Sequence, residues 1–233
     1  MTEHASNGSA STLACGEDGP ALRLQLIHIA RTTIARGLNV NKSGNVSARC
    51  NRGGTEGLLI TPTAIAYHDL TEQDLVFISL SDGRCSGVRA PSSEWRFHLD
   101  ILRARPEFGA IVHTHSPSAT ALSCHGLDVP PFHYMIAVCG GPDIRCAPYA
   151  TFGTQDLSDH ALAALADRKA CLLGNHGCVA CGSDLADALA VAQEVEHLAH
   201  IYLLARQLGE PLRLTEAQIA SVMEKFRTSY GQR

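Results

Sequence analysis

The stretch Ala110-Ile-Val-His-Thr-His-Ser-Pro117 joins a predicted strand directly to a predicted helix. Residues 110–115 alternate between apolar and polar side chains, the pattern of a strand that buries one face. Ser116 followed by Pro117 is typical of a helix start, because proline fits the first turn after the capping residue. A strand that passes straight into a helix indicates an α/β fold.

Similar patterns continue on both sides of this stretch. Helices are expected at about 22–34, 92–105, 157–167, 183–208 and 215–226, with Ser92 or Ser93 and Ser183 as caps of the second and fourth. Strands are expected at 45–50, 57–61, 75–80, 145–149, 171–174 and 178–181, several of them joined by short Gly-rich turns. This order favours one α/β domain with a mixed or antiparallel sheet covered by helices. Residues 1–17 are predicted to be a disordered leader, and residues 18–233 to form the domain.

The composition excludes several classes of function. The 233 residues carry 19 basic and 23 acidic side chains without a Lys/Arg cluster, so a nucleic-acid partner is not expected. The longest apolar region, 186–205, contains Glu194, Glu196 and two histidines, which argues against a membrane span. Without a secretory signal, nine cysteines predict reduced thiols in the cytoplasm. Cys178 and Cys181 form a CxxC that we interpret as buried small side chains, with metal binding as the weaker alternative.

Three histidines are candidates for a metal site. His113 and His115 are two apart on the predicted strand, so their side chains share one face and both can reach one ion. His176, in the turn 174–177 between two apolar strands, has a glycine on either side and can complete a tripod. Three neutral imidazoles with an open fourth position describe a catalytic zinc or similar divalent site. The alternative is that His113 and His115 are ordinary polar residues at a strand end.

Three polar turns indicate a phosphate site near these histidines. Ser92 and Ser93 open a helix whose free N–H groups favour an anion, and Glu94 follows in the first turn. The turns 43–47 and 61–63 are also polar. Each could be a plain turn by itself, but three of them beside a pair of strand histidines suggest a phosphate held near a metal.

Seven runs resemble class II aldolases of the L-fuculose-1-phosphate aldolase type, within the class II aldolase/adducin superfamily. They follow in the order SGNVS (43–47), ITPT (60–63), PSSEWRFH (91–98), VHTHS (112–116), HYMIAVCGG (133–141), CAPYATFGT (146–154) and GNHG (174–177). The resemblance covers about residues 22–230. It implies a single-domain, three-layer α/β/α sandwich around a largely antiparallel sheet, assembled as a ring-shaped homotetramer with active sites at subunit interfaces.

The resemblance also implies roles for individual residues. The expected zinc ligands are His113, His115 and His176, with Glu94 as a fourth ligand in the free enzyme and the acid/base in catalysis. Mn²⁺ and Co²⁺ are alternatives to zinc. The other matching positions are the phosphate contacts Gly44, Asn45, Thr63, Ser92 and Ser93, the catalytic tyrosines Tyr134 and Tyr230, and the aldehyde-pocket residues Phe152 and Phe226. Tyr134 is expected to reach the site of a neighbouring subunit.

Two positions depart from the family pattern. Ala64 follows Thr63 where relatives usually have glycine, so its Cβ is expected to alter the phosphate turn. Ser229 is an extra residue before Tyr230, which weakens the assignment of that tyrosine.

The implied activity is reversible cleavage of a ketose 1-phosphate to dihydroxyacetone phosphate and a small aldehyde. The substrate is expected to be L-fuculose 1-phosphate or a 5-deoxy- or 5-methylthio-pentulose 1-phosphate, between which the sequence does not choose. One alternative is a zinc-dependent pentulose-phosphate epimerase or dehydratase of the same superfamily. Others are a zinc hydratase or hydrolase that uses a zinc-bound water, and a non-enzymatic adducin-like interaction module.

Overall fold

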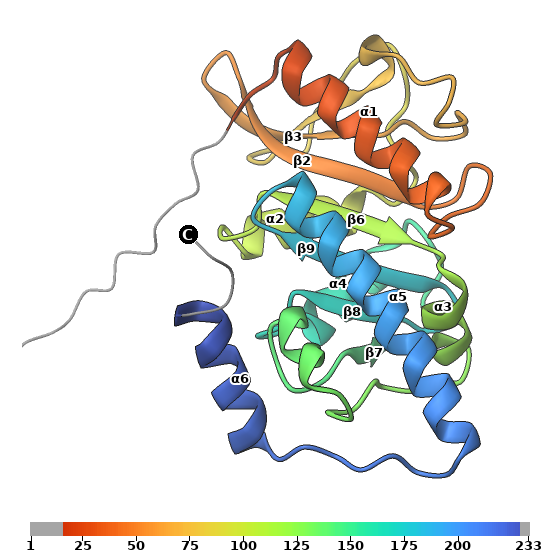
Figure 1. Cartoon of the computed structure of the whole chain (residues 1–233). Helices are drawn as coiled ribbons and strands as arrows, with labels where there is room; N and C mark the ends of the chain where they lie inside the picture. Colours follow the sequence, from red (N-terminus) through yellow and green to blue (C-terminus); the bar gives the residue numbers. More distant parts are fainter. Residues whose placement is uncertain (1–15, 229–233) are drawn as a thin grey trace, which may run out of the picture.

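The computed structural model describes residues 16–228, and their strands form one mixed sheet (Figure 1). The strands are β1 (Gly16–Glu17), β2 (Asn45–Arg52), β3 (Thr55–Ile60), β4 (Val76–Ser79), β5 (Cys85–Ser86), β6 (Ala110–Thr114), β7 (Arg145–Ala147), β8 (Ala170–Leu173) and β9 (Gly177–Gly182). The helices are α1 (Pro20–Ala35), α2 (Trp95–Ala104), α3 (Pro117–Ser123), α4 (Gln155–Ala164), α5 (Leu185–Gln207) and α6 (Glu216–Thr228), with 3-10 helices η1 (Glu72–Asp74) and η2 (Tyr134–Cys139). None of the helices within 16–228 is long and apolar enough to cross a membrane.

The sheet is largely antiparallel, as expected. Its order is β5-β4-β3-β2-β6-β9-β8-β7, with β1 paired to β2 off this path. Among the described residues only the pairs β1–β2 and β7–β8 are parallel. In the centre, β2 and β6 pair with Asn45 opposite His113, so these two residues lie on the same face of the sheet. This register places the polar turn before β2 beside the histidine strand.

Alternating side chains give the sheet two buried faces. On β6, Ala110 and Val112 belong to one apolar core, whereas Ile111 belongs to the other. Helices α1, α3, α5 and α6 supply the first core, and α2 and α4 supply the second. Figure 1 shows α1, α3 and α5 in front of the sheet. The expected three-layer α/β/α arrangement is therefore confirmed.

The end of the predicted leader lies within the fold. Gly16 and Glu17 pair with β2, and the Asp18 carboxylate after them forms ion pairs with Arg23 at 2.6 Å and Arg52 at 2.5 Å. The rest of the leader, 1–15, lies outside the described residues.

The predicted serine caps are also wrong. Neither Ser92 nor Ser93 caps α2, which begins at Trp95 with Glu94 in the N-cap position. The cap of α5 is Asp184 rather than Ser183, since the Asp184 carboxylate accepts hydrogen bonds from the first turn, whereas Ser183 lies one residue too early.

The CxxC on β9 holds two fully buried thiols on opposite faces of the sheet. Cys178 belongs to the core under α1, α3 and α5, and Cys181 to the core under α2 and α4. Residues three apart on a strand point in opposite directions, so the two sulfurs cannot share a metal ion. Their interpretation as buried small side chains is confirmed.

Candidate active site

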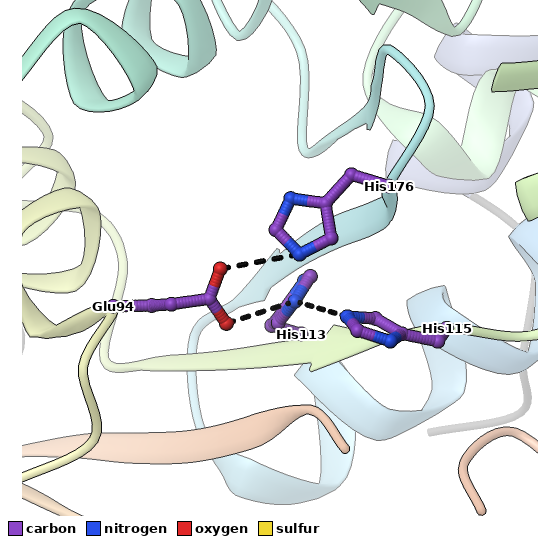
Figure 2. A group of neighbouring side chains, drawn as sticks. All are labelled: Glu94, His113, His115 and His176. Carbon is purple, nitrogen blue, oxygen red and sulfur yellow. Dashed lines mark hydrogen bonds and ion pairs between the residues drawn. The ribbon is translucent and has the colours of Figure 1, made fainter. Parts of the chain in front are cut away.

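Four side chains from separate parts of the chain converge on one point, and we call them the metal quartet: Glu94, His113, His115 and His176. Glu94 precedes α2, His113 lies on β6, His115 follows it, and His176 lies in the turn between β8 and β9. One ligand atom from each lies within 4.8 Å of those of the other three. Figure 2 shows the three imidazoles and the carboxylate pointing inward. The structure thus brings together all four predicted ligands.

The proton position on His113 shows what this point is suited to hold. Its Nδ1 lies 2.8 Å from the carbonyl oxygen of Cys178, which can only accept, so Nδ1 carries the proton. In a neutral imidazole Nε2 then carries a lone pair. That lone pair faces Nε2 of His115 at 3.1 Å and Oε2 of Glu94 at 3.3 Å. Because several electron-pair donors converge, the site fits a cation such as a divalent metal ion.

Glu94 is buried and ionised. Burial by itself raises the pKa of a carboxyl group, but the charges and hydrogen bonds of His113 and His176 hold the pKa of Glu94 well below its ordinary value. Its Oε1 forms an ion pair with Nε2 of His176 at 3.2 Å. Asn45 Nδ2 donates to Oε2 at 2.9 Å. Glu94 is therefore a carboxylate with one oxygen anchored by Asn45 and the other facing His176.

His115 is neutral at physiological pH. Burial and the charges of His113 and His176 lower its pKa to about 3, which leaves a free imidazole lone pair. Its backbone N–H donates to Oδ1 of Asn39 at 2.8 Å, and the Asn39 amide also donates to Thr33 on α1. Asn39 is 2% exposed. This buried amide holds the chain where it leaves β6 and so places the second histidine.

The third histidine is placed by a tight turn. Asn175 N–H donates to the Ser123 carbonyl at 3.0 Å and His176 N–H to the Leu173 carbonyl at 3.0 Å. A Cβ on Gly177 would overlap the Thr114 carbonyl, so only glycine lets β9 approach β6 at this point. The three imidazole centroids lie 4.8–4.9 Å apart, edge to face.

A cavity of about 430 Å³ opens above the metal quartet. Its walls include Glu94, His115 and His176 together with every predicted phosphate contact: Gly44, Asn45, Thr63, Ser92 and Ser93. Phe152, expected in the aldehyde pocket, also lines it. Lys42, Tyr149 and Asn175 are lining residues that sequence reasoning missed, although Lys42 directly precedes the predicted phosphate turn 43–47. A small anionic sugar phosphate fits such walls, with a cation site at the base.

The backbone of the turn before β2 has one conformation that only glycine tolerates well. Gly44 has φ of 74°, and a Cβ there would overlap the Asn39 side chain and the His113 carbonyl. The buried hydroxyl of Tyr67 donates to the Gly44 carbonyl at 2.8 Å. The turn is therefore packed directly onto the histidine strand.

Ala64 on the opposite wall occupies the same left-handed region, with φ of 62°. This conformation is costly for a residue with a Cβ and free of that cost for glycine. Ala64 therefore holds a strained backbone conformation in the wall of the cavity, and an altered phosphate turn at this position stays a prediction.

A buried histidine outside the ligand set is the main feature that sequence reasoning missed. His98 on α2 is 0% exposed and contacts Ser47 and Asn45 through its two ring nitrogens. Burial and the charge of His113 lower its pKa to about 3. The available signal was its spacing. His98 is four positions after Glu94, and residues four apart on a helix lie on the same face.

Two predicted site residues, Tyr134 and Phe226, lie away from this cavity. Tyr134, the first residue of η2, is 47% exposed, and Phe226 on α6 lines a separate cavity against η2. Tyr230, with Ser229, lies outside the described residues. The roles of these residues stay predictions.

Comparison with known proteins places the chain in a family. The class II aldolase and adducin N-terminal domain model matches residues 24–203. The chain is 51% identical over 211 residues to the 5-methylthioribulose-1-phosphate/5-deoxyribulose-1-phosphate aldolase of Rhodospirillum rubrum, across 91% of this chain and 93% of the relative. It is 46% identical over 213 residues to the L-fuculose phosphate aldolase of Escherichia coli strain K12, across 91% of this chain and 96% of the relative.

The fold gives the same assignment. A solved structure titled L-fuculose 1-phosphate aldolase superposes with a TM-score of 0.85 at 36% sequence identity, covering 94% of this chain and 100% of that one. A putative aldolase/epimerase/decarboxylase from Escherichia coli, YgbL, superposes with a TM-score of 0.77 at 31% identity, covering 87% and 98%. The chain therefore belongs to the class II aldolase and adducin N-terminal domain family.

Proposed function

We propose that the chain is a metal-dependent aldolase that reversibly cleaves a ketose 1-phosphate to dihydroxyacetone phosphate and a small aldehyde. The observation that carries this proposal is the shared cavity, where a carboxylate and three histidines meet three polar turns. An aldolase of this type needs a cation site, a group that transfers a proton and a phosphate-binding site, all close enough to contact one substrate molecule. The relatives named above supply the substrate class.

The metal quartet fits a zinc ion, because imidazole nitrogens and carboxylate oxygens are ligands that zinc prefers. When bound there, a divalent ion supplies Lewis acidity toward the ketone and adjacent hydroxyl oxygens of the substrate. Mn²⁺ and Co²⁺ are the alternatives, and metal analysis of protein purified without added metal distinguishes the three.

Glu94 carries the proton at the carbon that becomes C3 of dihydroxyacetone phosphate. Its depressed pKa makes it a carboxylate at neutral pH, the form that accepts this proton in the condensation direction. In the cleavage direction the carboxylic acid form of Glu94 donates this proton to C3 after the C3–C4 bond breaks and is left as the carboxylate. Glu94 lines the cavity that is proposed to hold the substrate.

The polar turns bind the phosphate. Ser92 Oγ accepts hydrogen bonds from Asn45 Nδ2 at 2.9 Å and from the Glu94 N–H at 3.3 Å, which leaves its own hydrogen to point to an anion. The N-terminus of α2 adds its dipole. Because the phosphate is bound at a distance from the reacting bond, its binding positions that bond over the metal quartet.

The active enzyme is proposed to be a homotetramer in which Tyr134 takes the C4 hydroxyl proton in a neighbouring subunit's site. The support is the position of Tyr134, half exposed on η2 and away from the cavity of its own chain. Phe226 and Tyr230 complete the site in the same proposal. Cytoplasmic location is proposed from the odd number of cysteines and from the two buried thiols of β9 on opposite faces of the sheet.

The experiment is a substrate panel. Release of dihydroxyacetone phosphate is measured with L-fuculose 1-phosphate and with 5-deoxy- and 5-methylthio-ribulose 1-phosphates, using protein before and after metal removal. Release that is lost with the metal and restored by zinc supports the proposal. Conversion of a pentulose phosphate without carbon–carbon cleavage would point instead to an epimerase or dehydratase. Absence of release from every member of the panel by metal-loaded protein would refute an aldolase.

A further inference from the structure

His98 occupies a buried position behind the catalytic carboxylate. It lies on α2 with 0% exposure, and its ring stacks on Phe97 with centroids 4.6 Å apart. Its Nδ1 lies 2.7 Å from the Ser47 hydroxyl, and its Nε2 contacts Oδ1 of Asn45. Ser47 and Asn45 are two residues apart on β2, so His98 joins the helix of Glu94 to the strand beside His113.

The hydrogen bonds of Asn45 fix the tautomer of His98. Asn45 Nδ2 donates to Ser92 Oγ and to Glu94 Oε2, each at 2.9 Å. Its Oδ1 is therefore the acceptor that faces His98, which requires a hydrogen on Nε2 of the imidazole. Nδ1 then has a lone pair and accepts from the Ser47 hydroxyl. Only in this arrangement does every donor in the series of contacts face an acceptor.

We propose that His98 is a positioning residue: its Nε2–H locks the Asn45 amide so that the amide N–H₂ faces Glu94 and Ser92. The proposal rests on the proposed function for its catalytic consequence. His98 touches neither substrate nor metal quartet through a hydrogen bond, and it acts through Asn45 alone.

The lock matters because a primary amide can turn over. Without a donor at the position of His98 Nε2, the Asn45 oxygen loses its partner, and only the hydrogen bonds to Ser92 and Glu94 still oppose rotation of the amide by 180°. The amide oxygen would then face the Glu94 carboxylate and Ser92 Oγ, and two electron-rich atoms would repel each other. Glu94 would lose the donor that anchors Oε2, and Ser92 would lose one of its two donors. The positions of Glu94, the proposed proton carrier, and of Ser92, the proposed phosphate contact, would both change.

Two variants of matched polarity separate this role from packing. Glutamine carries its side-chain nitrogen three bonds from Cβ, as far as Nε2 of histidine, whereas asparagine carries it two bonds away, as Nδ1 does. His98→Gln can therefore donate to Asn45, and His98→Asn cannot. His98→Leu removes both contacts. Ile101→Ala, on the same helix and 0% exposed, is the control for lost packing.

The first readout is kcat for dihydroxyacetone phosphate release. We expect His98→Asn and His98→Leu to lose roughly 10- to 100-fold, the effect typical of residues that orient a catalytic ligand, and His98→Gln to recover most of the loss. Ile101→Ala is expected to lower the unfolding midpoint and leave kcat unchanged. Equal losses in the Gln and Asn variants, or a comparable kcat loss in Ile101→Ala, would overturn the proposal.

The second readout does not depend on the reaction. Nitrogen-15 NMR of the wild-type protein should show His98 as the neutral Nε2–H tautomer. The Asn45 side-chain amide signals should be retained in His98→Gln and displaced in His98→Leu. An Nδ1–H tautomer, or Asn45 signals unmoved in His98→Leu, would contradict the positioning role. If the wild type cleaved no ketose 1-phosphate while these spectra behaved as expected, the proposed function would fail and the positioning of Asn45 would stand.

Discussion

The metal quartet and the rim of the cavity are held by the protein in different ways. In the quartet, His113 and Glu94 are buried, and each member has a hydrogen bond or ion pair from another element. At the rim, Phe152 and Tyr149 are 63% and 62% exposed, and Thr63, Ala64 and Ser93 are exposed as well. In the proposed function, the groups at the reacting bond are therefore held in place, whereas the exposed aromatic side chains of Tyr149 and Phe152 at the far end of the sugar can adjust.

This contrast agrees with the relatives. Relatives similar to the chain are named for L-fuculose phosphate and for 5-methylthioribulose or 5-deoxyribulose 1-phosphate. These sugars differ at the end remote from the phosphate. A shallow apolar rim discriminates weakly between such groups, since one added methylene is worth only about 1–3 kcal/mol.

Removing a ligand from the quartet should have the largest effect. In His176→Ala we expect metal affinity to fall by more than the roughly 10- to 100-fold that is typical of losing an outer partner, and cleavage to fall with it. The turn 174–177 keeps its backbone hydrogen bonds, so the chain should still fold. Metal content by mass spectrometry and far-UV circular dichroism check both points. Full metal occupancy in the variant would remove His176 from the ligand set.

A smaller effect is expected from the protonation of His98, the buried histidine behind the metal quartet. The pKa of His98 is about 3 in the folded chain because of burial and the charge of His113, against 6.5 as the ordinary value. As pH falls from 7 to 5, the unfolded chain takes up a proton at this residue and the folded chain does not. The unfolding free energy of wild type should therefore fall by about 2 kcal/mol more than that of His98→Gln over this range. Urea unfolding of metal-stripped protein at both pH values measures the difference, and parallel pH dependences would refute it.

The smallest effect is expected at the rim. Ala64 has φ of 62°, so Ala64→Gly should raise the unfolding free energy by about 1 kcal/mol, the strain relieved less the entropy that glycine adds to the unfolded chain. Ala190→Gly, exposed in the middle of α5, is the matched control and should lose about 1 kcal/mol. Urea unfolding of both variants tests the pair. A loss of stability in Ala64→Gly would show that the turn is not strained.

The sequence predicted the ligands better than the contacts that hold them. His113 and His115 were found because a strand puts alternate residues on one face, and His176 because glycines flank it. Asn45 and Glu94 are 49 residues apart in the sequence, and their hydrogen bond follows from the register of β2 with β6 and from the place where α2 begins. Pattern analysis identifies faces but no register between distant elements, so the roles of Asn39 and His98 became visible only in the fold.

The caps show the same limit on a local scale. Ser92 and Ser93 were expected to cap α2, but Ser92 hydrogen-bonds Asn45 and Glu94 occupies the N-cap position within the quartet. Ser92, a residue type suited to an N-cap, contacts Asn45 beside the cavity instead. At Ser92 and Ser93 the disagreement between local preference and structure lies at the candidate site, whereas at Ser183 the next residue, Asp184, takes the cap.

The most direct measurement is exchange of the C3 proton of dihydroxyacetone phosphate with solvent, followed by NMR in deuterium oxide without any aldehyde. Glu94→Gln keeps the size and polarity of the side chain but cannot take a proton at neutral pH. The three histidines remain to hold the metal, which mass spectrometry verifies in each sample. We predict that exchange in Glu94→Gln falls by roughly 10²–10⁴-fold relative to wild type, the contribution typical of a positioned acid/base. Exchange at the wild-type rate in the metal-loaded variant would contradict the assignment of Glu94 as the proton carrier.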